Sequence, residues 1–289
     1  MQSKTETGQQ RIHIGSVLCL SLAALCFGTG GLFIKMIPWS PLAINGARNL
    51  IGAALIGSYL LIRRHRLVFS RQVFIGAISL MGVTVLYVIA NKLTTAANTI
   101  VLQFTAPVFV ILLMALIYHV KPKRADVITC ILVFAGVVLF FIDGLRAGTV
   151  PGNLAALVSG IFYAGVFMMN AGKNADALSS CFLGQLASGL IFTPFCFRET
   201  DFSLYPTLTF VLLLGIVQLG GAYILFSEGI KNTPPVTAAL ITGLEPITNP
   251  ILVALFYHEK VSVLAIIGSV IVVGSILVYN IRLAKKGAS

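Results

Sequence analysis

Apolar blocks of about 20 residues follow one another along almost the whole chain, and this pattern limits the possible folds more than any other feature. A block of this length spans a hydrocarbon core of roughly 30 Å as a helix. Because lipid cannot hydrogen-bond an open backbone, each spanning block is expected to be helical. The blocks lie at 14–36, 41–62, 72–91, 97–119, 126–143, 152–171, 178–197, 208–230, 236–257 and 262–281.

The composition excludes a water-soluble enzyme. Hydrophobic residues make up 57% of the 289 residues and charged residues 10%, against roughly 45–50% and 25% in soluble domains. Little of the chain is left for a catalytic domain outside the membrane, and it contains no HExxH or GxSxG motif. We therefore predict an all-α membrane protein of ten transmembrane helices that is not an enzyme and has no cofactor and no metal.

The basic residues predict the orientation in the membrane. The net charge is +11, which in a soluble protein would suggest nucleic acid, but in a membrane protein reflects basic loops kept on the cytoplasmic side. With the N-terminus inside, the inner segments hold 14 Lys and Arg residues and the outer segments hold 5. We predict a multi-pass protein of the cell (inner or plasma) membrane with both termini cytoplasmic. Its predicted partners are the lipid bilayer and a small-molecule substrate, with no nucleic acid, and it is predicted to be a monomer or homodimer.

The two halves of the sequence repeat. A constant shift of 139 positions pairs a proline, a histidine and lysines of the two halves, and such matches do not arise by chance as apolar matches do. The pairs include Lys92 with Lys231, Pro107 with Pro246, His119 with His258 and Lys121 with Lys260. Since each half has five spans, an odd number, the second half must enter the membrane inverted, as in alternating-access carriers. The predicted divisions are a tail at 1–13, a first five-helix repeat at 14–143, a linker at 144–151, a second repeat at 152–283 and a tail at 284–289.

The paired stretches ANKLTTAANTIVLQFTAPVF (90–109) and GIKNTPPVTAALITGLEPIT (229–248) resemble the drug/metabolite transporter superfamily, EamA type. FYHEK at 256–260 and Arg48 within NGARNLIGAAL add to the resemblance. The resemblance implies a ten-span fold in which spans 1, 3, 4, 6, 8 and 9 surround a central cavity, and a role in metabolite export. The chain departs from the pattern at Val120, where the second repeat has Glu259.

Glu245 is the strongest candidate for chemistry. It lies about ten residues into its span, roughly 14 Å deep at 1.5 Å per residue, where an ionisable group is costly and is by default functional. A carboxyl group there can alternate between a proton and a cationic substrate. The alternative is a permanent ion pair with Arg48 or a lysine.

Prolines and polar side chains surround this position in the sequence. Pro246, Pro250 and Pro107 each leave the carbonyl four residues earlier without its helical donor, and the freed carbonyls of Thr242, Pro246 and Gln103 could bind a cation. The alternative is that the prolines only kink the helices. Gln103, Thr242 and Asn249 either line the cavity or hydrogen-bond to neighbouring helices.

Four further side chains have two interpretations each. Arg48 can bind a substrate carboxylate, but is expected to snorkel or to tie helix ends together. Glu228 is a gate or pairs with Lys231 three residues on. Tyr163 and Tyr223 contact substrate or pack. The predicted substrate-binding or proton-coupling residues are Glu245, Gln103, Thr242, Asn249, Tyr163, Tyr223 and Arg48, and the predicted gating or helix-break residues are Pro107, Pro246, Pro250 and Glu228.

These features predict a secondary active transporter that exports a small polar or amphipathic metabolite, such as an amino acid, amine or cationic drug-like solute. Proton antiport through alternating access is the expected mechanism. One alternative is a uniporter or exchanger of nucleotide-sugar or organic-phosphate type without proton coupling. The single basic residue at mid-membrane, Arg48, argues against it. A membrane enzyme or scaffold is the other alternative, and only His119 and His258 suggest it.

Overall fold

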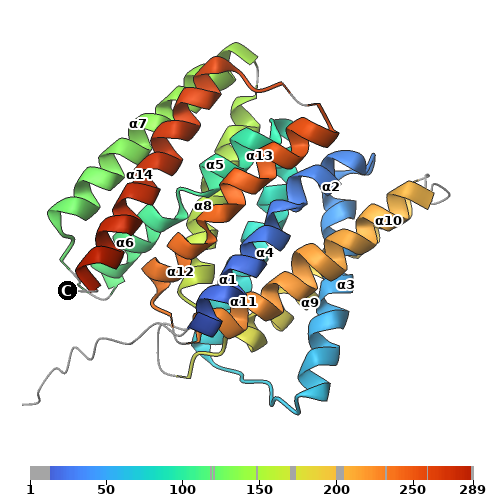
Figure 1. The fold of residues 1–289 in the computed structure, drawn as a ribbon. Coiled ribbons are helices and arrows are strands. Elements are labelled where there is room, and N and C mark those ends of the chain that lie inside the picture. The colour runs from blue at the N-terminus through green and yellow to red at the C-terminus, as the bar shows by residue number, and fades with distance from the viewer. Residues whose placement is uncertain are drawn as a thin grey trace, which may run out of the picture.

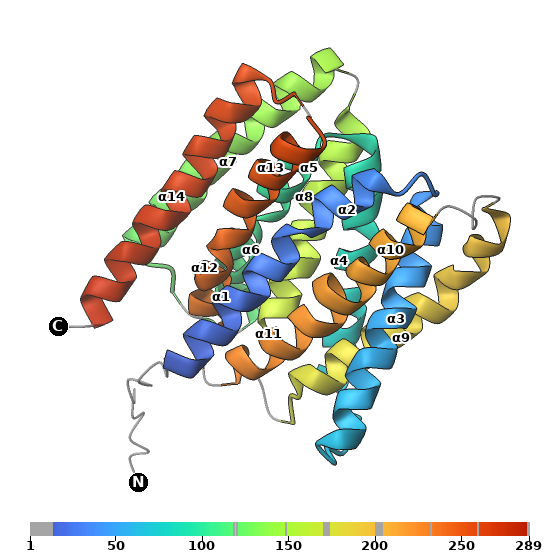
Figure 2. The same ribbon diagram turned by 45° about the vertical axis from the view of Figure 1, so that its right-hand side comes forward.

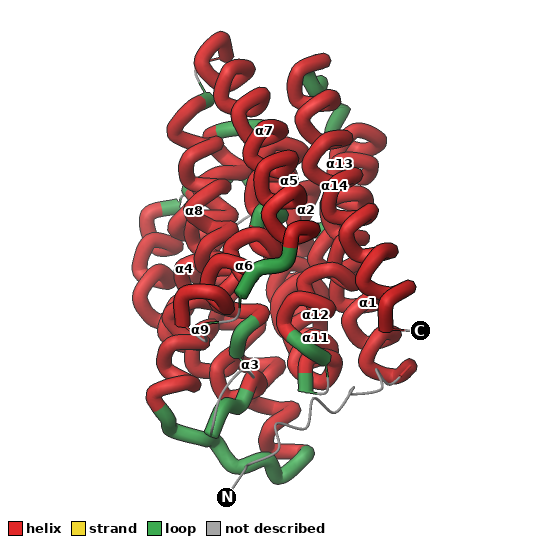
Figure 3. The backbone as a smooth tube through the Cα atoms, turned by 90° about the vertical axis from the view of Figure 1, so that its left-hand side faces the viewer, coloured by secondary structure: helices red, strands yellow, loops and turns green. Residues whose placement is uncertain are grey.

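The computed structural model describes residues 14–117, 119, 121–147, 149–169, 174–199, 205–231, 233–258 and 260–287. Every regular element within these ranges is a helix (Figure 3). Most of the helices run side by side along one long direction, as expected for a membrane bundle (Figure 1). The tail predicted at 1–13 lies outside the described residues.

The helices follow the apolar blocks of the sequence. In the first half they are α1 (Ile14–Gly28), α2 (Gly30–Met36), α3 (Pro41–Ile62), α4 (Arg71–Leu93), α5 (Ala96–Gln103), α6 (Ala106–Ile117) and α7 (Arg124–Ala147). In the second half they are α8 (Val150–Phe167), α9 (Ala177–Phe192), η1 (Thr193–Arg198), α10 (Tyr205–Leu213), η2 (Leu214–Gly221), α11 (Ala222–Ile230), α12 (Pro235–Ile241), η3 (Thr242–Leu244), α13 (Glu245–Phe256) and α14 (Val263–Gly287).

Eight helical stretches in the described part of the chain are long and apolar enough to cross a membrane. They correspond to all the predicted blocks except the second and the tenth. The second block forms α3, which carries Asn45, Arg48 and Asn49 among its apolar residues. The tenth block forms α14, whose apolar part, Val263–Tyr279, is shorter. The all-helical membrane fold is confirmed, and a count of ten crossings stays a prediction.

Short polar side chains define where several helices begin. The hydroxyl oxygens of Ser40, Ser70 and Thr95 accept hydrogen bonds from backbone N–H groups three residues on, at the starts of α3, α4 and α5. The Asp176 carboxylate does the same for the Ser179 N–H at the start of α9, at 2.7 Å. Each cap satisfies one of the N–H groups that a helix leaves without an internal partner.

Three spans are broken part of the way along. α1 and α2 are separated at Thr29, α5 and α6 at Phe104–Thr105, and α12 and α13 by the 3₁₀ turn η3. Pro107 follows the second break and Pro246 follows the third, and proline disfavours continuation of the preceding helix. The segment η2 is a π-helix that joins α10 to α11. Such departures from α-helical geometry often occur at functional sites.

The two halves of the chain are interleaved. The most extensive helix contacts each join one helix of the first half to one of the second, among them α3 with α9, α4 with α8, α1 with α11 and α7 with α14, and α5 also packs on α13. In Figure 2, α7 and α14 lie at one edge of the bundle and α3 and α9 at the other. The breaks of α5–α6 and α12–α13 are therefore brought together in the interior.

Candidate functional site

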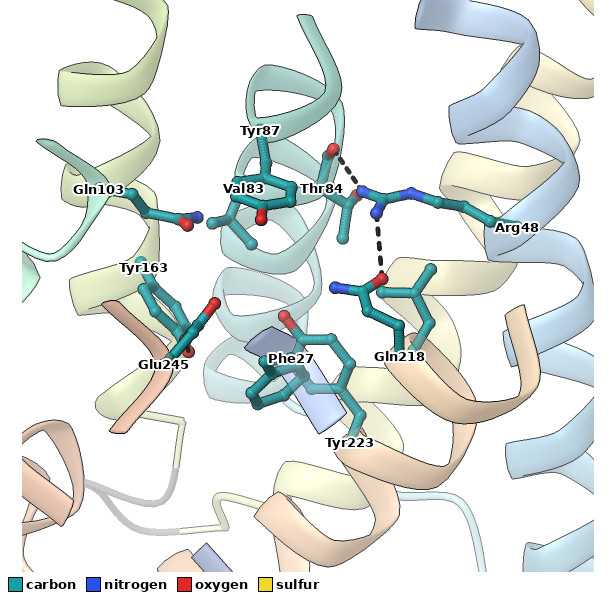
Figure 4. Close-up of a pocket in the computed structure, with 11 residues that line it drawn as sticks. Phe27, Arg48, Val83, Thr84, Tyr87, Gln103, Tyr163, Gln218, Tyr223 and Glu245 are labelled. Carbon is teal, nitrogen blue, oxygen red and sulfur yellow. Dashed lines mark hydrogen bonds between the residues drawn. The ribbon is translucent and has the colours of Figure 1, made fainter. Parts of the chain in front are cut away.

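A narrow cavity lies within the bundle, and both halves of the chain line it. Its volume of about 20 Å³ gives room for about one water molecule. The lining side chains come from α1, α3, α4, α5, α8, η2, α11 and α13 (Figure 4). They are Phe27, Arg48, Val83, Thr84, Tyr87, Gln103, Tyr163, Gln218, Leu219, Tyr223 and Glu245.

Glu245 is placed in this cavity by the break in its span. It is the first residue of α13, directly after the 3₁₀ turn, and its side chain is buried. The Tyr163 hydroxyl donates a hydrogen bond to its Oε2 at 3.0 Å. No ion pair to Glu245 is found among the described residues. The carboxyl group therefore faces the cavity with a neutral partner, not with Arg48 or a lysine.

Arg48 lies on the other side of the cavity. Its Nη1 donates to Gln218 Oε1 at 3.1 Å, and its Nη2 donates to the backbone carbonyl of Thr84 at 2.8 Å. The side chain is only 1% exposed. The expectation that Arg48 snorkels to a helix end is therefore wrong, because Gln218 on η2 and the α4 backbone hold the guanidinium inside the bundle.

The charged side chains are separated across the cavity. Figure 4 shows Glu245, Tyr163 and Gln103 on one side and Arg48 with Gln218 on the other. The hydroxyls of Tyr87 and Tyr223 point into the space between them (Figure 4). A bound solute can therefore meet an acidic group at one end and a basic group at the other.

Aromatic rings form one wall of the site, with Phe167 and Phe226 packed behind the lining rings. Phe27 packs edge-to-face on Tyr223 with centroids 4.8 Å apart, and Tyr163 packs on Phe167 at 4.6 Å. Phe226 joins the two pairs, with its centroid 5.6 Å from that of Phe167 and 6.2 Å from that of Phe27. This wall gives the cavity an apolar side next to its polar groups, which suits an amphipathic solute.

The structure brings five of the candidate residues, Arg48, Gln103, Tyr163, Tyr223 and Glu245, together around the cavity. Asn249 lies one layer behind, where its Nδ2 donates to the Tyr87 hydroxyl at 3.0 Å. The Thr242 hydroxyl donates back to the carbonyls of Ala238 and Ala239. The Thr242 carbonyl accepts the Glu245 N–H, so the prediction that Pro246 leaves this carbonyl free is wrong. The 3₁₀ turn supplies the missing donor.

Pro107 and Pro246 lie next to helix breaks and Pro250 lies inside α13, and none of the three lines the cavity. Pro246 and Pro250 line a separate apolar groove of about 530 Å³ between α13 and α14. Pro107 follows the α5–α6 break and is buried. The Gln103 carbonyl lies against α8, where a Cβ added at Gly160 would be 2.9 Å from it.

Glu228 forms a local pair at the end of α11. Lys231 Nζ donates to both of its carboxylate oxygens at 2.7 Å, and the Tyr59 hydroxyl lies 3.5 Å from Oε1. Both side chains of the pair are partly exposed. The structure therefore favours the interpretation in which Glu228 pairs with Lys231, and this pair lies away from the cavity.

Six lining residues were not predicted: Phe27, Val83, Thr84, Tyr87, Gln218 and Leu219. Gln218 and Tyr87 carried a usable signal, because each is a polar side chain inside an apolar span. Phe27, Val83 and Leu219 carried none, since apolar residues occur throughout the spans. In the part of the chain that the structure describes, no three His, Cys, Asp or Glu side chains come together to hold a metal ion.

Comparison with known sequences gives a family match over both halves. The sequence model of the EamA-like transporter family matches residues 14–142 and again residues 150–281. YwfM of Bacillus subtilis (strain 168), described as an uncharacterized transporter, is 26% identical over 274 residues, which cover 91% of this chain and 93% of YwfM. An uncharacterized transporter of Archaeoglobus fulgidus is 22% identical over 89% of this chain and 93% of its own.

Comparison with solved structures supports the fold. One protein crystal structure matches with a TM-score of 0.67 at 21% identity, over 93% of this chain and 98% of the other. At this identity the likeness shows the fold alone.

Proposed function

The chain belongs to the EamA-like transporter family, and from this premise we propose that it is a secondary active carrier that exports a small solute with an amino group by proton antiport. Both relatives compared above are described as transporters, and the match covers nearly the whole length of each. The solute class comprises amino acids, amines and cationic drug-like molecules of polar or amphipathic character. We further propose that the carrier lies in the cell membrane with both termini cytoplasmic.

The placement of Glu245 carries this proposal. A buried carboxyl group inside a membrane bundle is costly to ionise unless a cation replaces its proton. Its partner is the neutral Tyr163 hydroxyl, and it faces the cavity. Glu245 can therefore release a proton when an ammonium group binds, and bind a proton when the ammonium group leaves.

Contacts between the halves support a ten-span fold of two inverted repeats. In the two halves, α1 corresponds to α8 and α4 corresponds to α11. The contact of α1 with α11 and the contact of α8 with α4 are therefore equivalent, and both are present. Phe104 and Gly243 are equivalent at a shift of 139, and a Cβ at Gly243 would lie 3.4 Å from the Phe104 ring. Equivalent residues in contact are expected on a pseudo-twofold axis. Alternating access would then follow from rocking the repeats about the cavity.

Proton release from proteoliposomes tests the proposal. With a pH-sensitive dye inside the vesicles, addition of amines and neutral amino acids one at a time reports exchange without a labelled substrate. We expect Glu245→Gln to abolish the signal, because the amide cannot exchange a proton. Glu228→Gln makes the same change outside the cavity and is expected to keep the signal. Unchanged proton exchange in Glu245→Gln would rule out this role.

A further inference from the structure

Arg48 is a buried guanidinium whose described partners are neutral. It is 1% exposed, and it donates to the Gln218 side-chain carbonyl and to the Thr84 backbone carbonyl. Among the described residues no ion pair to Arg48 is found. A buried charge without a counter-charge is strongly unfavourable in a membrane protein. The cavity therefore presents a positive charge that a bound anion can neutralise.

The Arg48 guanidinium has N–H groups that donate to no described residue. An arginine carries five N–H groups, four of them on its terminal nitrogens. Gln218 and Thr84 each accept from one terminal nitrogen, so two terminal N–H groups are left. The Nε atom is buried and has no hydrogen-bond partner. Gln218 and Thr84 hold the guanidinium in place without neutralising it.

The neighbouring hydroxyls add further donors. The Tyr87 hydroxyl accepts a hydrogen bond from Asn249 Nδ2, so its own proton remains available to donate. No described residue hydrogen-bonds to the Tyr223 hydroxyl, which lines the cavity. Both hydroxyls point into the space between Arg48 and Glu245 (Figure 4). Donors around a fixed guanidinium are the usual recognition elements for a carboxylate.

We propose that Arg48 is the carboxylate-binding end of the cavity, so that the transported solute is a small zwitterion with an ammonium group at Glu245 and a carboxylate at Arg48. The inference rests on the proposed function and narrows its solute class. Arg48 and Tyr223 bind the carboxylate, and Gln218 and Thr84 orient Arg48. The cavity has a volume of only about 20 Å³ in this structure, so its walls must move apart around the solute, and the solute must be a small one.

Charge balance selects a zwitterion over an amine. With Glu245 ionised and Arg48 protonated, a zwitterion pairs both charges at once. An amine of the same shape pairs only Glu245 and leaves Arg48 without a counter-charge. A carboxylic acid without an amino group pairs Arg48 and leaves Glu245 protonated, so it cannot displace the proton. The amine therefore leaves one buried charge unpaired, at a cost to affinity, and the acid does not support proton exchange.

Ligand-dependent thermal unfolding of the purified full-length protein tests this directly, because a ligand of the folded state raises the melting temperature. The probes are neutral α-amino acids, each compared with the amine that lacks its carboxylate. We expect at least one amino acid to bind at least about tenfold more tightly than its amine, as the loss of a charged hydrogen bond predicts. Equal binding of amino acids and amines, or no stabilisation by any amino acid, would overturn the proposal.

Variants test whether Arg48 causes the difference in binding between amino acids and amines. Arg48→Lys keeps the charge but loses the fork, and it is expected to weaken amino-acid binding about 10- to 100-fold while amine binding stays the same. Tyr223→Phe leaves the contacts of Arg48 with Gln218 and Thr84 in place and is expected to weaken only amino-acid binding. Arg63→Lys, an exposed arginine at the end of α3, is the matched control. If Arg48→Lys and Tyr223→Phe both keep the amino-acid preference, the carboxylate does not bind at Arg48.

This binding experiment needs no proton gradient. Its result therefore tests the carboxylate site independently of the proposed antiport. Binding of amines alone, together with proton exchange that depends on Glu245, would leave the carrier proposal standing and remove the zwitterion. Binding of amino acids that depends on Arg48, together with unchanged exchange in Glu245→Gln, would support the carboxylate site and remove the coupling role of Glu245.

Discussion

Lys35 and Lys92 each donate a hydrogen bond to the backbone carbonyl that follows the other's helix. Lys35 Nζ, on α2, lies 2.9 Å from the carbonyl of Thr94, the C-cap of α4. Lys92 Nζ, on α4, donates to the carbonyl of Ile37, the C-cap of α2. A cation at a helix C-terminus is favourable and satisfies a carbonyl that lacks a helical donor. The reciprocal contacts hold the ends of α2 and α4 together.

Lys92→Met is expected to lower the free energy of unfolding by about 1–2 kcal/mol, because a charged hydrogen bond is lost and the Ile37 carbonyl loses its donor. Thermal melting of the purified protein measures the change. Lys121→Met makes the same substitution at an exposed position and is expected to melt as the wild type does. Equal melting of Lys92→Met and the wild type would show that the contact adds no stability.

Tyr163→Phe removes the hydroxyl that donates to Glu245 and keeps the ring that packs on Phe167. Because a hydrogen bond to a charged group contributes roughly 1.5–3 kcal/mol, proton-coupled exchange is expected to fall about tenfold or more. The proteoliposome assay measures it. Tyr59→Phe makes the same change next to Glu228, outside the cavity, and should exchange normally. Equal rates for both variants would assign Tyr163 to packing alone.

The positions of the helices could be predicted because the membrane thickness sets their length. The block predicted at 72–91 is α4, Arg71–Leu93, and the block at 97–119 contains α5 and α6. The break of the first span at Thr29 was not predicted, although Gly28, Gly30 and Gly31, which disfavour a helix, flank it. The break also lies against α13, where a Cβ at Gly28 would lie 2.9 Å from Thr248 Cβ. Such contacts between distant segments leave no local pattern.

The acidic side of the site and its candidate tyrosines could be predicted, whereas the phenylalanines of the aromatic wall and the burial of Arg48 could not. Glu245 was identified because a carboxyl group is rare inside an apolar span. Phe27 is 2% exposed and Phe74 is 51% exposed, yet both are phenylalanines inside apolar blocks. The burial of Arg48 depends on Gln218, 170 residues away in the other half. The sequence around Arg48 alone therefore suggested a snorkelling side chain.

Asp176→Ala is expected to lower the free energy of unfolding by about 1 kcal/mol, because Asp176 caps α9 through the Ser179 N–H. His65 Nε2 also lies 3.2 Å from the same carboxylate oxygen. Asp176→Asn keeps a capping oxygen and loses the charge, so it is expected to fall between the alanine variant and the wild type. Thermal melting at neutral pH ranks the three proteins, and an alanine variant as stable as the wild type would exclude the cap as a source of stability.

The charge of Asp176 also predicts a pH dependence. Burial alone would raise the pKa of Asp176, but hydrogen bonds from Ser179 and the interaction with His65 outweigh it and lower the pKa below the ordinary 3.8. A lowered folded-state pKa contributes stability that is present above the unfolded pKa and is lost as the pH falls through the folded pKa. The difference in melting temperature between wild type and Asp176→Asn should therefore be constant above about pH 5 and shrink below about pH 4. A difference that does not change down to pH 2.5 would contradict this.

Gly46 allows α3 to approach the end of α9 closely. Because α3 belongs to the first half of the chain and α9 to the second, this approach also brings the two halves together. A Cβ at Gly46 would overlap the backbone of Phe192 and Thr193, and backbone cannot rotate away as a side chain can. Gly46→Ala is therefore expected to lower the free energy of unfolding by about 1–3 kcal/mol. In thermal melting, Gly274→Ala on α14 is the matched control. Nothing lies within 4 Å of its added Cβ, so the variant should be equally stable or up to about 1 kcal/mol more stable.

The position next to Gly46 shows what this close approach supports. Asn45 Nδ2 donates to Ser188 Oγ at 2.9 Å, so a hydrogen bond between α3 and α9 is formed one residue from the glycine. An alanine at 46 pushes the helices apart and stretches this bond, whereas Asn45→Ala removes the bond and leaves the approach intact. If the close approach matters more than the bond, Gly46→Ala should melt at a lower temperature than Asn45→Ala. The double variant should then melt close to Gly46→Ala, because the bond is already lost. Additive losses would instead show that the approach and the bond stabilise the contact between the halves independently.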